Sequence, residues 1–246
     1  MGISTKLDKL HAEARQNRWL RYFTIFIRIA LAFGFATAGM VKIVGERFAS
    51  GLSVNHPMGH YLEALHHTGY YYTFIGIGQV LAAILLLIPR TVLLGAILYF
   101  PIILNICILS YAVRFEGSII TSPLMVLADL YLLCWNYDKL KHILPFNNAT
   151  IPVDVPKQKT LSNKFPLKFF LAVFATFVIL LLLVRFGFDV MPRNSFKDCN
   201  AQFKGTNRTK AGYNFCDCIH NNGQPLDKCL DDYKKAPDDM PNASTP

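Results

Sequence analysis

Five long apolar blocks constrain this 246-residue chain more than any other feature of its sequence. The blocks lie at 20–44, 70–89, 91–113, 119–135 and 166–187. Each is about 20 residues long, as a helix must be to cross a hydrocarbon layer of about 30 Å. Lipid cannot satisfy open backbone polar groups, so each block is expected to be a helix. Only 17% of the residues are charged, which leaves little amphipathic sequence to cover these helices in water. The prediction is an all-α membrane protein with five spans.

Basic residues predict the orientation, because Lys and Arg concentrate on the cytoplasmic side of membrane helices. The charged N-terminal arm, the tight turn at Arg90 and the lysine-rich connection 139–164 must share one side. Connections on the other side hold little beyond Arg47 and Arg114. We therefore expect a cytoplasmic N-terminus and a C-terminus outside. This topology accounts for the net charge of +9, so the basic composition does not point to nucleic-acid binding.

The order of the blocks predicts five regions along the chain. Short connections between the first four spans favour antiparallel neighbours in a four-helix transmembrane bundle. The fifth span is plainly apolar and is expected to act as an anchor. The regions are an arm at 1–19, the bundle at 20–138, a cytoplasmic linker at 139–164, a fifth transmembrane helix at 165–188 and a small extracytoplasmic domain at 189–246.

Polar residues inside the apolar blocks are the first candidates for a functional site, since charged groups in a span need a partner or a wet cavity. Arg28, Gln79 and Asp129 lie at similar depths, counted at about 1.5 Å per residue from the expected helix ends. We predict an ion pair between Arg28 and Asp129 with the Gln79 amide beside it. Asn105 and Ser110 extend this layer outward. The layer either locks the helices together, at about 1 kcal/mol per hydrogen bond, or forms a pocket for a quinone, a proton or a small substrate.

Three stretches of the bundle carry a family resemblance. They are "IRIALAFGFATAGMVKIVG", with Arg28, Gly39 and Lys42, then "GIGQVLAAILLLIPRTVLLGAILYFPIILNI" at 76–106 and "LMVLADLYLLCWNYDKL" at 124–140. Together they cover about 20–145 and resemble the DoxX-like membrane proteins, which are bacterial four-span bundles similar to the small subunit of thiosulfate:quinone oxidoreductases and to a membrane protein of methylamine utilisation. The resemblance implies a redox-linked or quinone-linked membrane protein. Similar members often have a glutamate where Gln79 stands. The fifth span and the cysteine-containing tail look like an added module.

The connection 46–69 contains four of the seven histidines. The spacing of His56, His60 and Glu63 places three metal-ligating side chains on one helix face. Pro57 and Gly59 interrupt the start of that helix, however, and no second cluster completes a coordination shell. We therefore favour histidines and tyrosines at the membrane–water interface over a metal site.

Four of the six cysteines, Cys199, Cys216, Cys218 and Cys229, lie in the last fifty residues, on the side where disulfides persist. Cys216 and Cys218 are too close together to bridge easily, so two disulfides are expected to link them to Cys199 and Cys229 in either of two connectivities. One rival is thiol–disulfide exchange at Cys216 and Cys218, and the other is a zinc site that includes His220. The remaining Cys107 and Cys134 fall inside spans and are expected to be small buried hydrophobes.

Two functions fit this sequence. The first is a membrane subunit of a redox-linked system in the bacterial inner membrane, with quinone as the cofactor in the polar layer and Cys216 and Cys218 as an outer relay. The second is a non-enzymatic scaffold that lies in the lipid bilayer and assembles membrane or periplasmic protein partners through its outer domain. The sequence has no nucleophile–base pair, phosphate-binding loop or metal shell, which argues against catalysis by this chain alone.

Overall fold

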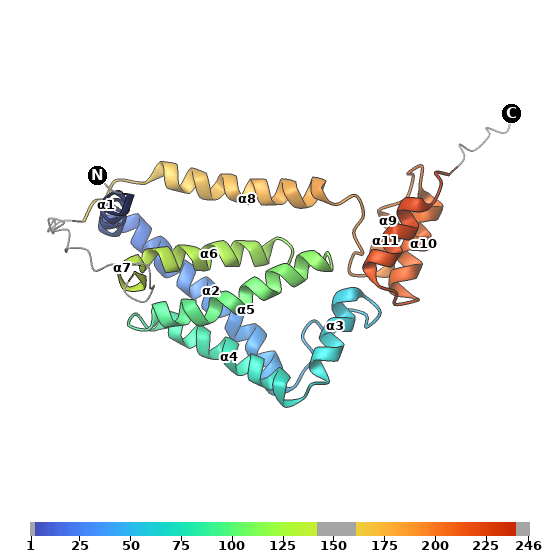
Figure 1. The fold of residues 1–246 in the computed structure, drawn as a ribbon, viewed down its shortest axis with the longest axis horizontal. Coiled ribbons are helices and arrows are strands. Elements are labelled where there is room, and N and C mark those ends of the chain that lie inside the picture. The colour runs from blue at the N-terminus through green and yellow to red at the C-terminus, as the bar shows by residue number, and fades with distance from the viewer. Residues whose placement is uncertain (1–2, 142–160, 240–246) are drawn as a thin grey trace. The chain divides into compact units, whose positions relative to one another are not determined.

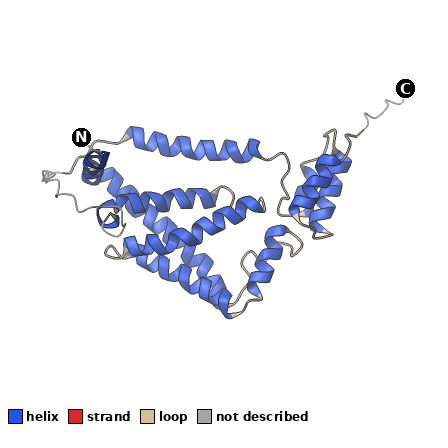
Figure 2. Ribbon diagram, in the orientation of Figure 1, coloured by secondary structure: helices blue, strands red, loops and turns tan. Residues whose placement is uncertain are grey.

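The computed structural model describes residues 3–141 and 161–239, which form eleven helices and no strand (Figures 1 and 2). In chain order the helices are α1 (Ile3–Gln16), α2 (Arg18–Val44), α3 (Pro57–His66), α4 (Tyr70–Leu87), α5 (Val92–Ala112), α6 (Thr121–Trp135), α7 (Tyr137–Leu140), α8 (Leu167–Gly187), α9 (Phe196–Ala201), α10 (Thr209–His220) and α11 (Leu226–Lys235). The all-α prediction is confirmed for this part of the chain. Most of the expected linker 139–164 lies outside the described residues, as does the last part of the C-terminal tail.

Four helices, α2, α4, α5 and α8, are long and apolar enough to cross a membrane. Their bounds agree with four of the five predicted spans to within two residues. The block predicted at 119–135 forms α6, which has only 15 residues and a length of about 22 Å. This helix is shorter than the hydrocarbon layer, so it does not meet the length requirement by itself.

The chain divides into two compact units, and the boundary between them passes through the long helices rather than through the linker. The first unit contains Met1–Met40, Ile77–Leu104 and Leu124–Leu180, and the second contains Val41–Gly76, Asn105–Pro123 and Leu181–Pro246. Each unit is described by itself below.

In the first unit, Asn17 determines where α2 begins. Its Oδ1 accepts hydrogen bonds from the backbone N–H groups of Trp19 and Leu20, at 2.9 and 3.2 Å, as a helix N-cap does. Its Nδ2 donates to the carbonyl of Lys164, 2.8 Å away. The first turn of α2 is thereby tied to the segment that leads into α8.

Aromatic side chains hold three helices of the first unit together. The Phe23 ring of α2 contacts Tyr131 of α6 and both Phe169 and Phe170 of α8, with ring centroids 5.3–5.6 Å apart and nearly perpendicular planes. This edge-to-face geometry is favourable beyond the area that it buries. α4 and α5 approach closely at Gly95, where a Cβ atom would lie 2.7 Å from the backbone nitrogen of Leu86.

The second unit contains the connection 45–69, which is ordered by hydrogen bonds. Gly45, with φ of +87°, ends α2 in a left-handed conformation that favours glycine. The Tyr72 hydroxyl donates to the carbonyl of Glu46 and accepts from the N–H of Phe48. Pro57 is the first residue of α3, where a missing N–H costs nothing, and His56 is the N-cap. The expected interruption at Pro57 is therefore the start of the helix.

The second unit also contains a small three-helix domain, here called the cap (residues 189–239), in which α10 packs against α9 and α11. Its core consists of Val190, Cys199, Phe203, Phe215, Cys216, Ile219, Leu226, Cys229 and Leu230. Such a small core buries little apolar area, so covalent links contribute a large share of its stability.

The packing of the cap can be tested at Gly212, where a Cβ atom would overlap the Phe203 ring. We expect Gly212→Ala to destabilise the cap by about 1–3 kcal/mol, because the ring must leave its place in the core. Gly187→Ala is the matched control, since nothing lies within 4 Å of the Cβ position there. Hydrogen exchange of α9–α11 in the full-length protein measures both. Equal protection in the two variants would contradict this packing.

Candidate functional site

Arg28 does not form the predicted ion pair with Asp129. Its Nε donates to the carbonyl of Leu86 at 2.8 Å and its Nη2 to the carbonyl of Leu87 at 2.7 Å. These two carbonyls belong to the last turn of α4, where carbonyl groups have no partner within the helix and carry partial negative charge. Two of the five N–H donors of this guanidinium thus bond to the end of a neighbouring helix, and Arg28 fastens α2 to α4.

Asp129 is therefore left as a buried carboxyl group in the first unit, with an exposed fraction of 0%. Neither of its oxygens has a hydrogen-bond partner. The same is true of the Gln79 Oε1 atom and the Tyr99 hydroxyl, whose side chains are 1% and 0% exposed. Leaving a buried polar group unpaired costs about 1–3 kcal/mol, and more for a charged one. Each such group in a native structure needs an explanation, and a bound ligand is one.

The three side chains lie at similar depths, about 9–12 Å along their helices from the ends at Leu87, Val92 and Trp135. One face of the Tyr99 ring is stacked on Phe35, with centroids 3.5 Å apart. We call Gln79, Tyr99 and Asp129 the buried polar triad.

The carbonyl of Ile97 is a further polar group close to Tyr99 in the sequence, because Pro101 cannot donate a helical hydrogen bond to it. This proline lies inside α5, four residues after Ile97. Tyr99 was not predicted from the sequence, although a signal was present. Tyrosines of membrane helices normally lie near the interface, whereas Tyr99 stands seven residues inside its helix and two before a proline.

Asn105 does not belong with this buried set. Its side chain is exposed on α5. Ser110 is buried, but its hydroxyl is already satisfied by the carbonyl of Ile106 and by Ser118 Oγ, at 2.7 and 2.6 Å. Of the four residues predicted to line a polar pocket, the structure leaves Gln79 and Asp129 with unused hydrogen-bonding capacity.

The candidate metal ligands in the connection 46–69 are engaged separately. His56 Nδ1 accepts from the N–H of Met58, His60 is exposed, and Glu63 contacts Arg47 at 3.2 Å and His67 at 3.6 Å. Across the described residues, no three His, Cys, Asp or Glu side chains form a group that could hold a metal ion.

His56 instead lies at the junction between the connection 46–69 and the cap, within the second unit. Its ring is 5.8 Å from the ring of His220, which donates through Nε2 to the carbonyl of Pro192 at 2.7 Å. Next to it, Asn55 Nδ2 donates to the carbonyls of His220 and Asn221, at 2.9 and 3.1 Å. Burial lowers the pKa of His56 to about 4; the neighbouring His220 adds to this shift and the Arg193 backbone opposes it. Both histidines are buried, and the lowered pKa of His56 means that its imidazole is neutral in the closed junction.

The four cysteines of the cap form two disulfides, Cys199–Cys216 and Cys218–Cys229, which is one of the two connectivities that the sequence allows. With all four cysteines in disulfides, no thiolate remains to bind zinc at the alternative site, and His220 Nε2 is hydrogen-bonded to the carbonyl of Pro192. The other two cysteines do not behave as expected, because Cys107 is only partly buried and Cys134 is exposed.

The fold and its sites define a class: a helical protein with four helices able to span a membrane, a buried polar triad and a disulfide-bonded helical cap. The chain belongs to the family of the uncharacterized protein YwoB of Bacillus subtilis (strain 168). The two are 37% identical over 110 residues, which is 43% of this chain and 71% of the relative. No family model and no solved structure matches the chain.

Acid is expected to weaken the junction at His56. An opened junction exposes an imidazole with a pKa near 6.5, whereas the closed one has a pKa of about 4. The open state therefore takes up a proton first, and stability falls as the pH drops from about 6.5 to about 4, by at most about 3 kcal/mol. Hydrogen exchange of residues 46–69 against pH measures this loss.

His56→Asn should flatten that pH dependence, because asparagine keeps an N-cap acceptor and cannot take up the proton. His60→Asn, on the same helix but exposed, is the matched control and should leave the pH profile as it is in the unmodified protein. An acid response that survives in His56→Asn would show that another group is responsible.

Proposed function

We propose that this protein is a DoxX-like membrane subunit of a redox-linked system and that its helix bundle binds the head group of a quinone at the buried polar triad. The observation that carries the proposal is the Asp129 carboxyl group, buried at 0% exposure with two unpartnered oxygens. A group of this kind inside an apolar layer is a functional-site hypothesis by default.

The chemistry of the triad favours a ligand that both donates and accepts hydrogen bonds. The Tyr99 hydroxyl can donate to a carbonyl oxygen, while the Gln79 Oε1 and an oxygen of Asp129 can accept from a hydroxyl group. A quinone presents carbonyls and its reduced form presents hydroxyls, so the same three side chains suit both states. The stacked Phe35–Tyr99 pair supplies a flat aromatic wall for a flat ring.

The proposed placement is the bacterial inner membrane, with the N-terminus in the cytoplasm and the cap in the periplasm. Four helices support it by length and composition, and α6 is proposed as the fifth span. Because α6 is short, residues on either side of it must complete the crossing, or the bilayer must thin beside it. With α6 counted, four spans separate the N-terminal arm from the lysine-rich linker, so these basic segments share one side, in agreement with the basic-residue distribution. The single span α8 then puts the disulfides on the opposite side, in agreement with disulfide chemistry.

Quinone binding can be measured by titrating a short-chain quinone into the protein in lipid nanodiscs. We expect saturable binding that weakens roughly tenfold in Tyr99→Phe and in Asp129→Asn, each the effect of about one lost hydrogen bond. Thr176→Val is the matched control, since that hydroxyl lies in a span, is exposed and bonds to the carbonyl of Ala172. Absence of saturable binding, or equal affinity in all variants, would overturn the proposal.

A second proposed function is a scaffold that assembles protein partners, and the attachment of the cap favours it. Arg114 Nη1 donates to the carbonyl of Val190 at 2.6 Å, Arg193 pairs with Glu116, and Asn55 bonds to two carbonyls of the cap. The cap is thus held by groups on both the connection 46–69 and the turn after α5. A domain that is held in place at several points can present a fixed surface to a protein partner. A preparation of this chain alone that is active with quinone would count against the scaffold.

A further inference from the structure

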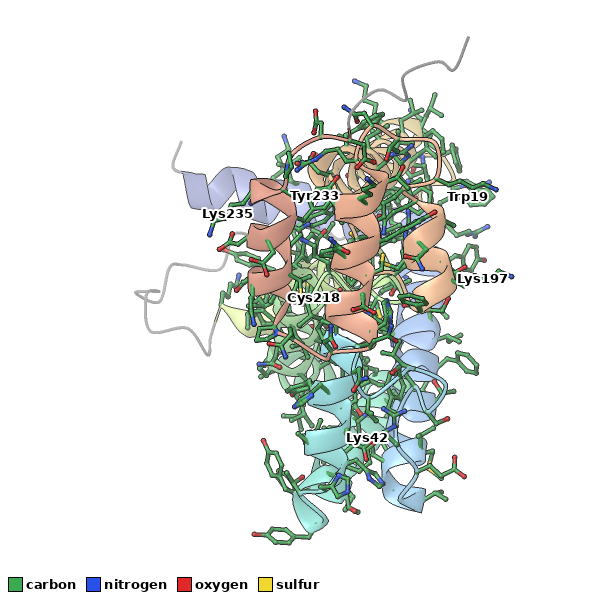
Figure 3. All side chains as sticks on the ribbon, turned by 90° about the vertical axis from the view of Figure 1, so that its right-hand side faces the viewer. Trp19, Lys42, Lys197, Cys218, Tyr233 and Lys235 are labelled. Atoms are coloured by element: carbon green, nitrogen blue, oxygen red, sulfur yellow. A yellow bond between two sulfur atoms is a disulfide. The ribbon has the colours of Figure 1, made fainter. Side chains whose placement is uncertain are left out.

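A cavity of about 260 Å³ lies between α10 and α11 of the cap. We call it the cap groove. Its lining consists of Ala211, Asn214, Phe215, Cys218, Cys229, Asp232, Tyr233 and Ala236. Figure 3 shows the cap with Cys218 and Tyr233 labelled. The Cys218–Cys229 disulfide therefore forms part of the wall of the groove.

The two disulfides of the cap differ in access. Cys199 and Cys216 are both 0% exposed and belong to the core. In the other disulfide Cys229 is 1% exposed, but Cys218 is only partly buried. Thiol–disulfide exchange needs a thiolate to reach a sulfur atom, so access selects Cys218 as the sulfur that is attacked.

The helix positions of the two sulfurs favour the same direction of attack. Cys229 is the fourth residue of α11, whereas Cys218 is two residues before the end of α10. The partial positive charge at a helix N-terminus stabilises a thiolate, and the partial negative charge at a C-terminus does the opposite. Attack at Cys218 thus expels the sulfur that better carries negative charge.

We infer that the cap groove is a thiol–disulfide exchange site for the cysteine side chain of another protein. The incoming thiolate attacks Cys218 Sγ, the Cys218–Cys229 bond breaks, and Cys229 leaves as a thiolate. The product is a mixed disulfide between Cys218 and the partner's cysteine. It is resolved in one of two ways: a second cysteine of the partner attacks the partner's sulfur in the mixed disulfide and releases Cys218, or Cys229 attacks Cys218 and releases the partner. In the first case two partner thiols are oxidised to a disulfide and the cap disulfide is reduced to two thiols.

Size and charge define the occupant. The cavity is smaller than the roughly 300 Å³ at which small-molecule sites begin, so it suits a single side chain. Asp232 lines the groove and carries negative charge, which favours a basic residue beside the reacting cysteine. The Cys199–Cys216 disulfide stays closed in the core, so the cap keeps one covalent link throughout. This inference goes beyond quinone binding by the bundle and does not depend on it.

The test uses the full-length protein in nanodiscs and two synthetic peptides, one with Lys next to its cysteine and one with Glu. After reaction the free thiols are alkylated and mapped by mass spectrometry. We expect a mixed disulfide at Cys218, an alkylated Cys229 and no reaction at Cys199 or Cys216. The Lys peptide should react roughly threefold to fivefold faster, and Asp232→Asn should remove that preference.

Ala236→Phe fills the groove while leaving all four cysteines in place, and it should slow exchange roughly tenfold or more. Asp232→Asn, an exposed isosteric change, keeps the test valid if the larger side chain disturbs the fold. The inference is overturned if Cys218 forms no mixed disulfide, if Cys199–Cys216 reacts as fast, or if Asp232→Asn leaves the peptide preference unchanged. Because no quinone is present, failure here is distinct from failure of quinone binding.

Discussion

The inability of an apolar layer to satisfy polar groups is the constraint on which the rest of this structure depends. It makes the long blocks helical, and it dictates what each polar side chain inside them must do. Arg28 meets the constraint with two carbonyls at the end of α4, and Thr24 of α2 meets it with the carbonyl of Leu20 and the Tyr131 hydroxyl. The buried polar triad does not meet it, because Gln79, Tyr99 and Asp129 keep unpartnered atoms. That contrast, within one bundle, is the basis for the proposal that a ligand binds at the triad.

A different constraint governs the cap. Its core is small, and each of its two disulfides ties α10 to one neighbouring helix, α9 through Cys199 and α11 through Cys229. The cap is then attached by polar contacts, such as the pair between Arg193 and Glu116 and the hydrogen bonds from Asn55 to the carbonyls of His220 and Asn221. The Cys218–Cys229 disulfide borders the cap groove, whereas Cys199 and Cys216 lie in the core. The same small domain thus combines a closed structural link with one that borders a groove.

Sequence alone was sufficient for the features that follow from composition and periodicity. Long apolar runs predict α2, α4, α5 and α8, and four clustered cysteines predict a domain with two disulfides. The hydrogen-bond partners of the buried polar residues could not be predicted from the sequence. Residue counting put Arg28 and Asp129 at one depth, but it does not show which way each side chain points around its helix. Every residue has a backbone carbonyl, so the sequence does not show that Arg28 bonds to the carbonyls of Leu86 and Leu87. Tyr99 was overlooked because tyrosine is common near membrane surfaces, and the choice between two disulfide connectivities needed the packing of α10 between its neighbours.

The most direct test of the central claim is an experimental density map of the full-length protein in lipid nanodiscs with a short-chain quinone added. The triad should appear as side chains of α4, α5 and α6 that converge on additional density, with the Tyr99 hydroxyl and an Asp129 oxygen at hydrogen-bonding distance from it. A map in which Asp129 is paired with Arg28, or in which the three polar groups are bonded to one another with no space between them, would contradict it.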